Sequence, residues 1–182
     1  MMDVEVELQK LLAEREITRL LFAYHEAINR GRFEELGELF EHATYQTAYA
    51  RTAEAHGTQQ ADGVVRNWQT MVHLYDGLPR VHYITTNVVV TIDDALTTAR
   101  AYSYYMGFQA LRDYYDATAG DFPLQAITAG RYEDTFEVID DRWRFRSRQI
   151  WADLSGDLSR HMRMLPGDYR RLVEEPPGDG TR

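Results

Sequence analysis

The hydrophobic pattern of this chain changes once, near residue 80, from the period of helices to the period of strands. Before that point apolar residues recur every three or four positions, which is the spacing of an amphipathic helix. After it, residues 81–151 form long runs rich in β-branched and aromatic residues, separated by short turns. Helices followed by antiparallel strands predict an α+β fold, in which the helices pack on one face of a curved sheet.

The chain has 182 residues, which is the size of one domain. We expect a single domain over residues 1–165 and a partly disordered tail over 166–182, where proline and glycine accumulate. Before the sheet, we predict a first helix with an apolar stripe over 17–28, which ends at a cap formed by Asn29-Arg30-Gly31. A short helix over 33–40, a loop with a short strand over 44–60, and a helix over 64–75 follow.

Charge and cysteine content exclude several classes of function. Twenty Lys and Arg residues against 29 Asp and Glu residues leave a net charge of −9, which argues against nucleic-acid or anionic-lipid partners. The absence of cysteine excludes disulfides, thiolate metal sites and a cysteine nucleophile. Glycine-rich phosphate loops and GxSxG elbows are also missing. The histidines lack ligand-like spacing, so we expect neither a metal nor a cofactor.

The start of the chain does not have the pattern of a signal peptide, because MMDVEVELQK is acidic and no apolar run follows it. No stretch reaches the roughly 18 apolar residues that span a membrane. A cytoplasmic location without a membrane partner is the expectation.

A two-residue turn at Asp140-Asp141 sets the register of the last hairpin. It pairs Glu137 with Arg144 and Glu133 with Arg148, so that four arginines at 142, 144, 146 and 148 share one face. This face is either an anion-binding patch or, as we favour, a solvated face with cross-strand ion pairs. Arg148 is the expected exception, because it lies farthest from the turn.

The opposite face of this hairpin is apolar near the turn and polar farther away, where Asp134, Gln149 and Trp151 follow. A face with this gradient indicates a core that merges into a cavity. For Asp134 the alternative is a strand that bends or a face that is solvated there.

A similar turn near Asp94-Ala95 places His82 opposite Gly107, again at the polar end of a face that begins with small apolar residues. The missing side chain of Gly107 leaves room for a ligand, and a neutral histidine can take and return protons near neutral pH. His82 is therefore the candidate base. The alternative is a histidine at the start of a strand that contacts solvent. His25 is expected to be a partly exposed helical residue.

Three segments carry a resemblance to a known family: LLFAYHEAINRGRFEELGELF, RVHYITTNVVV and AGRYEDTFEVIDDRWRFRSRQIW. Over about residues 8–162 the chain resembles the SnoaL-like group, which belongs to the nuclear-transport-factor-two-type superfamily. The resemblance implies a cone-shaped, curved mixed sheet wrapped around a pocket and closed by N-terminal helices. Relatives include scytalone dehydratase, polyketide cyclases and ketosteroid-isomerase-like enzymes.

The resemblance also implies catalytic positions. In dehydratase-like members a strand histidine acts as base and an aspartate at the end of the first helix orients it. His82 matches the histidine, whereas Asn29 stands where the family often has aspartate. Tyr24 matches a tyrosine that polarises a carbonyl or holds a water, although a core tyrosine is an equal alternative.

The leading function is a lyase or isomerase that needs no cofactor and acts on a hydrophobic cyclic molecule through His82, Asn29 and Tyr24. The expected pocket lining is Trp68, Tyr105, Asp134, Gln149 and Trp151. The chain is expected to form a homodimer or homotrimer through the outer sheet face. A rival is a ligand-binding or assembly subunit like the β chains of ring-hydroxylating dioxygenases. A third is an epoxide-opening hydrolase, with Arg100 or Arg148 beside Asp134.

Overall fold

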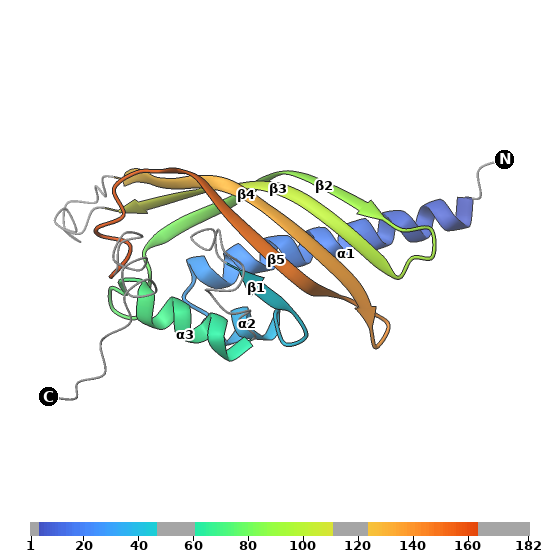
Figure 1. Ribbon diagram of the computed structural model, residues 1–182, viewed down its shortest axis with the longest axis horizontal. Coiled ribbons are helices and arrows are strands. Elements are labelled where there is room, and N and C mark those ends of the chain that lie inside the picture. The colour runs from blue at the N-terminus through green and yellow to red at the C-terminus, as the bar shows by residue number, and fades with distance from the viewer. Residues whose placement is uncertain (1–3, 47–60, 111–123, 164–182) are drawn as a thin grey trace, which may run out of the picture.

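The computed structural model describes residues 4–46, 61–110 and 124–163, and it has the predicted α+β architecture (Figure 1). The expected tail over 166–182 lies outside the described residues. The elements are α1 (Val4–Asn29), α2 (Phe33–Glu38), β1 (Thr44–Gln46), α3 (Ala61–Met71), β2 (Val81–Ile92), β3 (Thr98–Ala110), β4 (Leu124–Ile139) and β5 (Arg142–Ser155).

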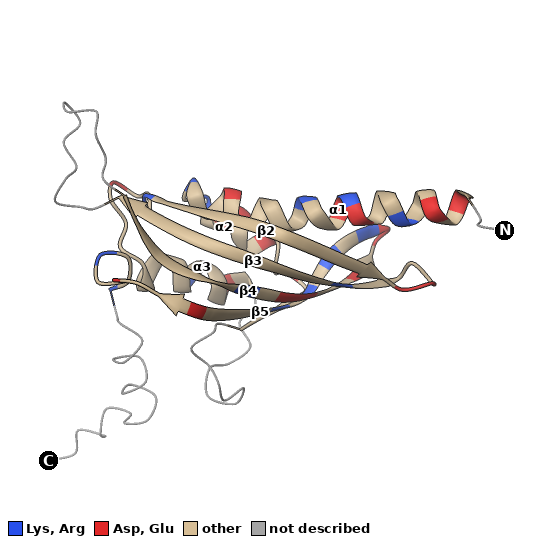
Figure 2. Ribbon diagram, turned by 90° about the horizontal axis from the view of Figure 1, so that it is seen from above, with Lys and Arg blue, Asp and Glu red and all other residues tan. Residues whose placement is uncertain are grey.

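The strands form one curved, unclosed sheet in the order β1-β5-β4-β3-β2. β2 to β5 are consecutive antiparallel neighbours, whereas β1 runs parallel to β5, so the sheet is mixed. The long helix α1 lies along one face of the sheet (Figures 1 and 2). No helix in the described ranges combines the length and apolar character needed to span a membrane.

The apolar stripe of α1 packs into the core as its spacing predicts. Ile17, Leu21, Tyr24 and Ile28 are each at most 1% exposed, and they follow one another at four, three and four residues. The helix ends where the cap was expected. Gly31 has a φ of 66°, a left-handed conformation that glycine adopts without strain.

The last hairpin begins in the predicted register. Asp140 and Asp141 both have positive φ, as the two central residues of a type I′ turn require. Glu137 then pairs with Arg144, as predicted. Beyond this point the register shifts by one residue, so Arg148 pairs with Asp134 rather than with Glu133, and that predicted pair is wrong. A one-residue shift turns side chains to the other face, so Arg148 is buried. It is the one arginine of this strand that was expected to depart from the solvated face.

A second irregularity changes the face of β2. The register shifts between Thr86 and Val89, around Asn87, which has a φ of 52°. His82 consequently pairs with Phe108 and is exposed, while Tyr83 pairs with Gly107. The predicted position of His82 opposite Gly107 is therefore wrong. Two differences from the predicted register produce this result. The pairing begins with Ile92 opposite Ala99 instead of Thr97, and the backbone distortion around Asn87 then moves it by one residue and reverses the face of β2.

Candidate functional site

A cavity of about 110 Å³ lies between the sheet, α1, α3 and the segment that follows β5. Its walls are aromatic and apolar with a few hydroxyl, amide and imidazole groups, and none of the described residues that line it is Asp, Glu, Lys or Arg. The lining consists of Tyr24, Ile28, Tyr45, Asn67, Trp68, Met71, Val72, Tyr83, Tyr105, Thr128, Tyr132, Ile150, Ala152, Leu158, His161 and Met162.

Tyrosine rings form a continuous row along the cavity. The ring centroids of Tyr24 and Tyr132 are 5.8 Å apart, and those of Tyr132 and Tyr105 are 4.6 Å apart. Tyr83 continues the row at 6.2 Å from Tyr105. These separations are typical of favourable aromatic pairs, so the row is a stiff wall with its hydroxyl groups held in place.

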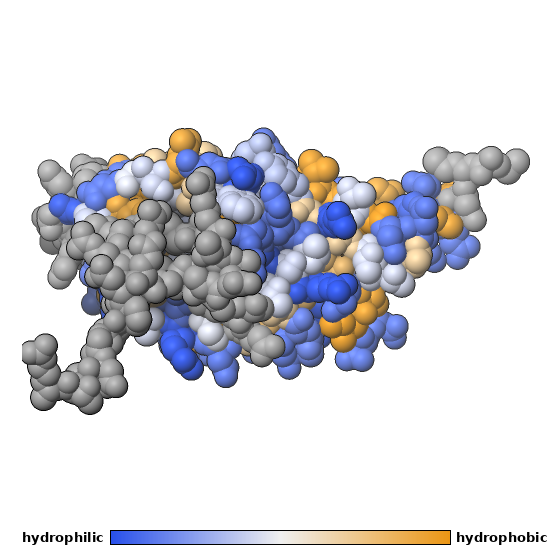
Figure 3. Space-filling view, viewed as in Figure 1, coloured by the Kyte–Doolittle hydropathy of each residue, from blue (hydrophilic) through white to orange (hydrophobic). Residues whose placement is uncertain are grey.

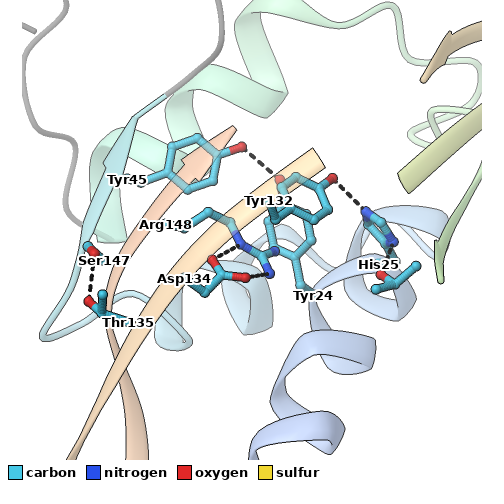
Figure 4. A network of polar contacts seen from close by, with 9 residues as sticks. Tyr24, His25, Tyr45, Tyr132, Asp134, Thr135, Ser147 and Arg148 are labelled. Atoms are coloured by element: carbon cyan, nitrogen blue, oxygen red, sulfur yellow. Dashed lines mark hydrogen bonds and ion pairs between the residues drawn. The ribbon is translucent and has the colours of Figure 1, made fainter. Parts of the chain in front are cut away.

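One end of this row carries a pair of tyrosine hydroxyls. The Tyr24 and Tyr45 hydroxyl oxygens are 2.7 Å apart, and both residues are at most 2% exposed (Figure 4). Burial raises the pKa of both phenols, because the charged form would lose its hydration. Both hydroxyls therefore stay protonated near neutral pH. Since one of them donates to the other, the pair has one O–H left to donate to a ligand oxygen.

The other end of the row carries a tyrosine–histidine pair. His161 is 4% exposed, and its Nε2 lies 2.9 Å from the Tyr83 hydroxyl oxygen. Burial, with a smaller effect from His73, lowers the pKa of His161 to about 4, so the imidazole is neutral near pH 7. Its Nδ1 is buried and has no hydrogen-bond partner among the described residues.

Backbone hydrogen bonds hold His161 beside the end of α3. The His161 carbonyl accepts a hydrogen bond from the His73 N–H at 2.8 Å, and the Arg163 N–H donates to the Met71 carbonyl at 2.8 Å. This pairing of distant segments carries no periodic signal in the sequence, which explains why sequence reasoning missed His161.

Behind the tyrosine row lies a buried ion pair. Arg148 donates from Nε and Nη2 to the two carboxylate oxygens of Asp134, each at 2.8 Å (Figure 4). The guanidinium carbon is 4.1 Å from the centroid of the Tyr24 ring and 4.2 Å from that of Tyr132. Burial raises the pKa of the Asp134 carboxyl, against the opposite effect of Arg148. The ion pair thus positions the tyrosine wall from behind. Asp134 was expected to line the cavity, but it is not among the lining residues.

His25 supports the same wall from within the core. It is 4% exposed, so the prediction of a partly exposed residue is wrong. Its Nε2 lies 2.8 Å from the Tyr132 hydroxyl and its Nδ1 lies 2.7 Å from the Thr85 hydroxyl. Burial, with a smaller effect from Arg148, holds the pKa of His25 well below its usual value. The neutral ring fixes the direction of the Tyr132 hydroxyl.

Asn29 bonds to backbone rather than to a histidine side chain. Its Nδ2 donates to the Tyr83 carbonyl at 3.1 Å, and its Oδ1 accepts from the Tyr83 N–H at 2.7 Å. A carboxamide offers both the donor and the acceptor that this edge strand needs, whereas an ionised aspartate offers only acceptors. The expected contact between Asn29 and His82 is absent, and His82 does not line the cavity.

The other predicted site residues divide between the cavity and the outer face. Tyr24, Trp68 and Tyr105 line the cavity. Gln149 instead donates from Nε2 to the Ile150 carbonyl and borders a groove outside the cavity. Trp151 packs its ring under the Arg131 guanidinium, 5.3 Å from the ring centroid. The register shift between Thr135 and Phe136 explains these departures, because it turns Gln149 and Trp151 to the other face of β5.

The space expected at Gly107 is occupied. A Cβ atom at this position would lie 2.8 Å from Cε1 of Tyr83, so the Tyr83 ring fills the volume that a side chain would take. Across the described ranges, no three His, Cys, Asp or Glu side chains are grouped so that they could hold a metal ion.

Comparison with known proteins places the chain in a family. Residues 9–149 match the family model of the SnoaL-like domain. The chain belongs to the SnoaL-like family. No curated protein has a sequence similar enough to match this SnoaL-like chain.

Solved structures share the fold of this SnoaL-like protein. An NTF2-like protein with a cystatin-like fold from Novosphingobium aromaticivorans is 18% identical, with a TM-score of 0.63 over 87% of this chain and 95% of that one. A candidate scytalone dehydratase from N. aromaticivorans DSM 12444 is 19% identical, with a TM-score of 0.59 over 82% and 89%. The β subunit of a candidate aromatic-ring-hydroxylating dioxygenase from the same strain is 18% identical, with a TM-score of 0.59 over 81% and 93%.

Proposed function

We propose that this SnoaL-like protein is a lyase or isomerase that needs no cofactor and acts on a hydrophobic cyclic molecule by histidine acid–base catalysis. The observation that carries the proposal is a cavity whose lining among the described residues carries no charged group, and in which Nδ1 of the buried His161 has no partner in the described part of the chain. His161 takes the catalytic role that sequence analysis assigned to His82.

The size and lining of the cavity limit the ligand. An apolar cavity of about 150 Å³ binds benzene, so a cavity of about 110 Å³ suits a molecule of roughly one ring. Aromatic walls such as Trp68 and Tyr105 favour ring stacking. A charged ligand would lose hydration without meeting an opposite charge in the lining, so we expect an uncharged one.

The two polar ends of the tyrosine row suit proton transfer beside a carbonyl group. The Tyr24–Tyr45 pair would donate its one free O–H to the substrate oxygen and stabilise the enolate that forms there. Nδ1 of His161 would take the proton from the neighbouring carbon, while the bonding electrons move toward the carbonyl oxygen. Nε2–H would then donate to the Tyr83 hydroxyl oxygen. Returning the proton to another carbon gives isomerisation, and loss of a leaving group gives elimination.

Deuterium exchange tests this proposal without knowledge of the natural substrate. We would follow exchange of the protons beside the carbonyl of 2-cyclohexen-1-one in deuterated buffer by NMR. His161→Gln should reduce the catalysed exchange by about 10²–10⁴-fold, the range of general acid–base catalysis. His82→Gln is the matched control and should keep the wild-type rate, because His82 is exposed and outside the cavity. Loss of exchange in the His82 variant alone would contradict the assignment.

An assembly or ligand-binding subunit is the second candidate. The observation that favours it is that Asn29 uses both its Nδ2 donor and its Oδ1 acceptor on the Tyr83 backbone, so that it does not pair with His82. The dioxygenase β subunit that shares the fold illustrates such a role. Co-purification with a larger iron-containing chain, together with no exchange by the isolated protein, would support this candidate over the enzyme.

An epoxide-opening hydrolase has less support. Its water-activating set would need Asp134 and Arg148 at the cavity surface, but neither residue is among the cavity lining.

A further inference from the structure

The indole N–H of Trp68 is a buried hydrogen-bond donor on the cavity wall. Trp68 belongs to α3, lines the cavity and is 8% exposed. Its Nε1 has no hydrogen-bond partner among the described residues. An indole N–H can only donate, and a buried donor that stays unpaired lowers stability. An unpaired donor in a cavity wall therefore indicates a ligand that supplies the acceptor.

The surroundings of this donor differ from the outer surface. On the face shown in Figure 3, hydrophilic residues are mixed with scattered apolar ones, and water can pair with any donor there. The described lining of the cavity is mainly aromatic and apolar, with few polar groups. Each of those polar groups therefore has a large effect on which ligand the cavity accepts.

Three ring contacts hold the indole at one polar end of the cavity. Its ring centroid is 6.4 Å from that of Phe33, and the two rings are nearly parallel at 16°. The rings of Tyr83 and His161 approach edge-on, with centroids at 5.9 Å and 6.4 Å. These contacts set the direction of the N–H before a ligand binds.

The indole N–H also lies beside the Tyr24–Tyr45 pair at the other polar end. Burial raises the pKa of Tyr45, whereas Tyr24, Arg148 and the Trp68 N–H act in the opposite direction. The N–H is thus close to the Tyr45 hydroxyl oxygen, although the two make no hydrogen bond of ordinary distance and angle. Since the tyrosine pair keeps one O–H for a ligand, Trp68 offers a second donor next to it.

We propose that the Trp68 N–H and the free O–H of the Tyr24–Tyr45 pair donate to the same ligand oxygen, and that the substrate is therefore a cyclic carbonyl compound. A carbonyl oxygen has two lone pairs and can accept both hydrogen bonds. A hydrocarbon ring of the same shape would leave both donors unpaired, so the cavity discriminates against it. The inference rests on the proposed function, in which this oxygen becomes the enolate oxygen and two donors stabilise its charge better than one.

Two probes of equal shape test the pair of donors. They are 2-cyclohexen-1-one and 3-methylenecyclohexene, in which a CH₂ group replaces the oxygen, and NMR titration gives both dissociation constants. In Trp68→Phe, the preference for the ketone over the hydrocarbon should fall about fivefold relative to wild type, which corresponds to one hydrogen bond. A change in cavity size alone would weaken both probes alike and leave this preference unchanged.

Trp151→Phe is the matched control. Nε1 of Trp151 is also buried and unpartnered within the described ranges, but Trp151 does not line the cavity. This variant should keep the wild-type preference. If Trp68→Phe does not fold, 3-benzothienylalanine at position 68 keeps both rings and lacks the N–H, and the same loss of about fivefold is expected.

The carbonyl stretching band of bound, isotope-labelled 2-cyclohexen-1-one gives a second readout. A carbonyl that loses a hydrogen bond regains double-bond character, so the band should lie at higher wavenumber in Trp68→Phe than in wild type. Trp151→Phe should leave the band in place. Lost packing around the ring would not produce this shift.

Failure of the wild-type protein to bind the ketone would overturn the proposal, as would an unchanged preference or an unchanged band in Trp68→Phe. The expected changes in Trp68→Phe, without catalysed deuterium exchange by wild type, would support the donor pair and contradict the catalytic role of His161. Exchange by wild type with no change of preference in Trp68→Phe would support the catalytic role and reject the donor pair.

Discussion

His25, His82 and His161 show how strongly the surroundings of a residue decide what it can do. His25 and His161 are each 4% exposed and bonded to tyrosine hydroxyls, whereas His82 is exposed on the outer face of β2. The predicted hairpin register and the family resemblance favoured His82 as the base. Burial favours His161, because its imidazole is held by the Tyr83 hydroxyl and shielded from water inside the protein.

The low pKa of His161 predicts a loss of stability in acid. The unfolded chain has an ordinary histidine, so between about pH 6.5 and pH 4 it binds a proton that the folded chain does not bind. The free energy of unfolding should therefore decrease as the pH falls through this window, by at most about 1.4 kcal/mol per pH unit from this residue. The lowered pKa of His25 acts in the same direction.

Urea unfolding of wild type and His161→Gln at pH 7 and pH 4.5 measures this contribution. The variant should lose less stability on acidification than the wild-type protein, while His82→Gln should behave like wild type because its side chain is exposed in the fold. If wild type and His161→Gln lost the same free energy of unfolding between pH 7 and pH 4.5, His161 would not be a buried, neutral residue in the folded protein.

At the scale of elements, two irregular positions decide which side chains reach the interior. The shift around Asn87 turns Tyr83 inward and His82 outward, and the shift between Thr135 and Phe136 turns Arg148 inward. Without the second shift, the arginine would join the solvated face of β5 and the tyrosine wall would lose its cation. Both distortions therefore build the site.

Asn87 provides a direct test of the first irregularity. Its φ of 52° is tolerated by asparagine and glycine but strained for a β-branched residue. Asn87→Val should lower the free energy of unfolding by about 1–2 kcal/mol, whereas Asn87→Gly should stay close to wild type. Urea unfolding monitored by circular dichroism measures both. A valine variant as stable as wild type would mean that the distortion is not present in solution.

At the scale of the whole molecule, the sheet, α1, α3 and the segment after β5 together enclose the cavity. No single element supplies it, and the polar groups on its walls come from all three layers: α1 and α3, strands β1 to β4, and the segment after β5. The structural neighbours share the fold at 18–19% identity, so the chemistry of this chain rests on its own residues.

The uncharged lining predicts selective stabilisation by uncharged rings. A ligand present at about 100 times its dissociation constant stabilises the folded state by about 2.7 kcal/mol. We therefore expect 2-cyclohexen-1-one to raise the thermal midpoint in a concentration-dependent way. Benzoate, a ring of similar size with a charge, should leave the midpoint unchanged. Equal shifts with both compounds would contradict the proposed ligand class.

The sequence by itself determined the order of elements, the α1 core stripe, the Gly31 cap and the Asp140-Asp141 turn, since each depends on residues close together in the chain. Sequence analysis also expected Trp68 and Tyr105 in the pocket lining and, from the family resemblance, Tyr24 in the site, and the structure places all three in the cavity wall. Only the tertiary structure decided that His161, Tyr83 and Tyr45 meet there. Their contacts join segments far apart in sequence, and a one-residue bulge reverses which side chains of a strand face inward.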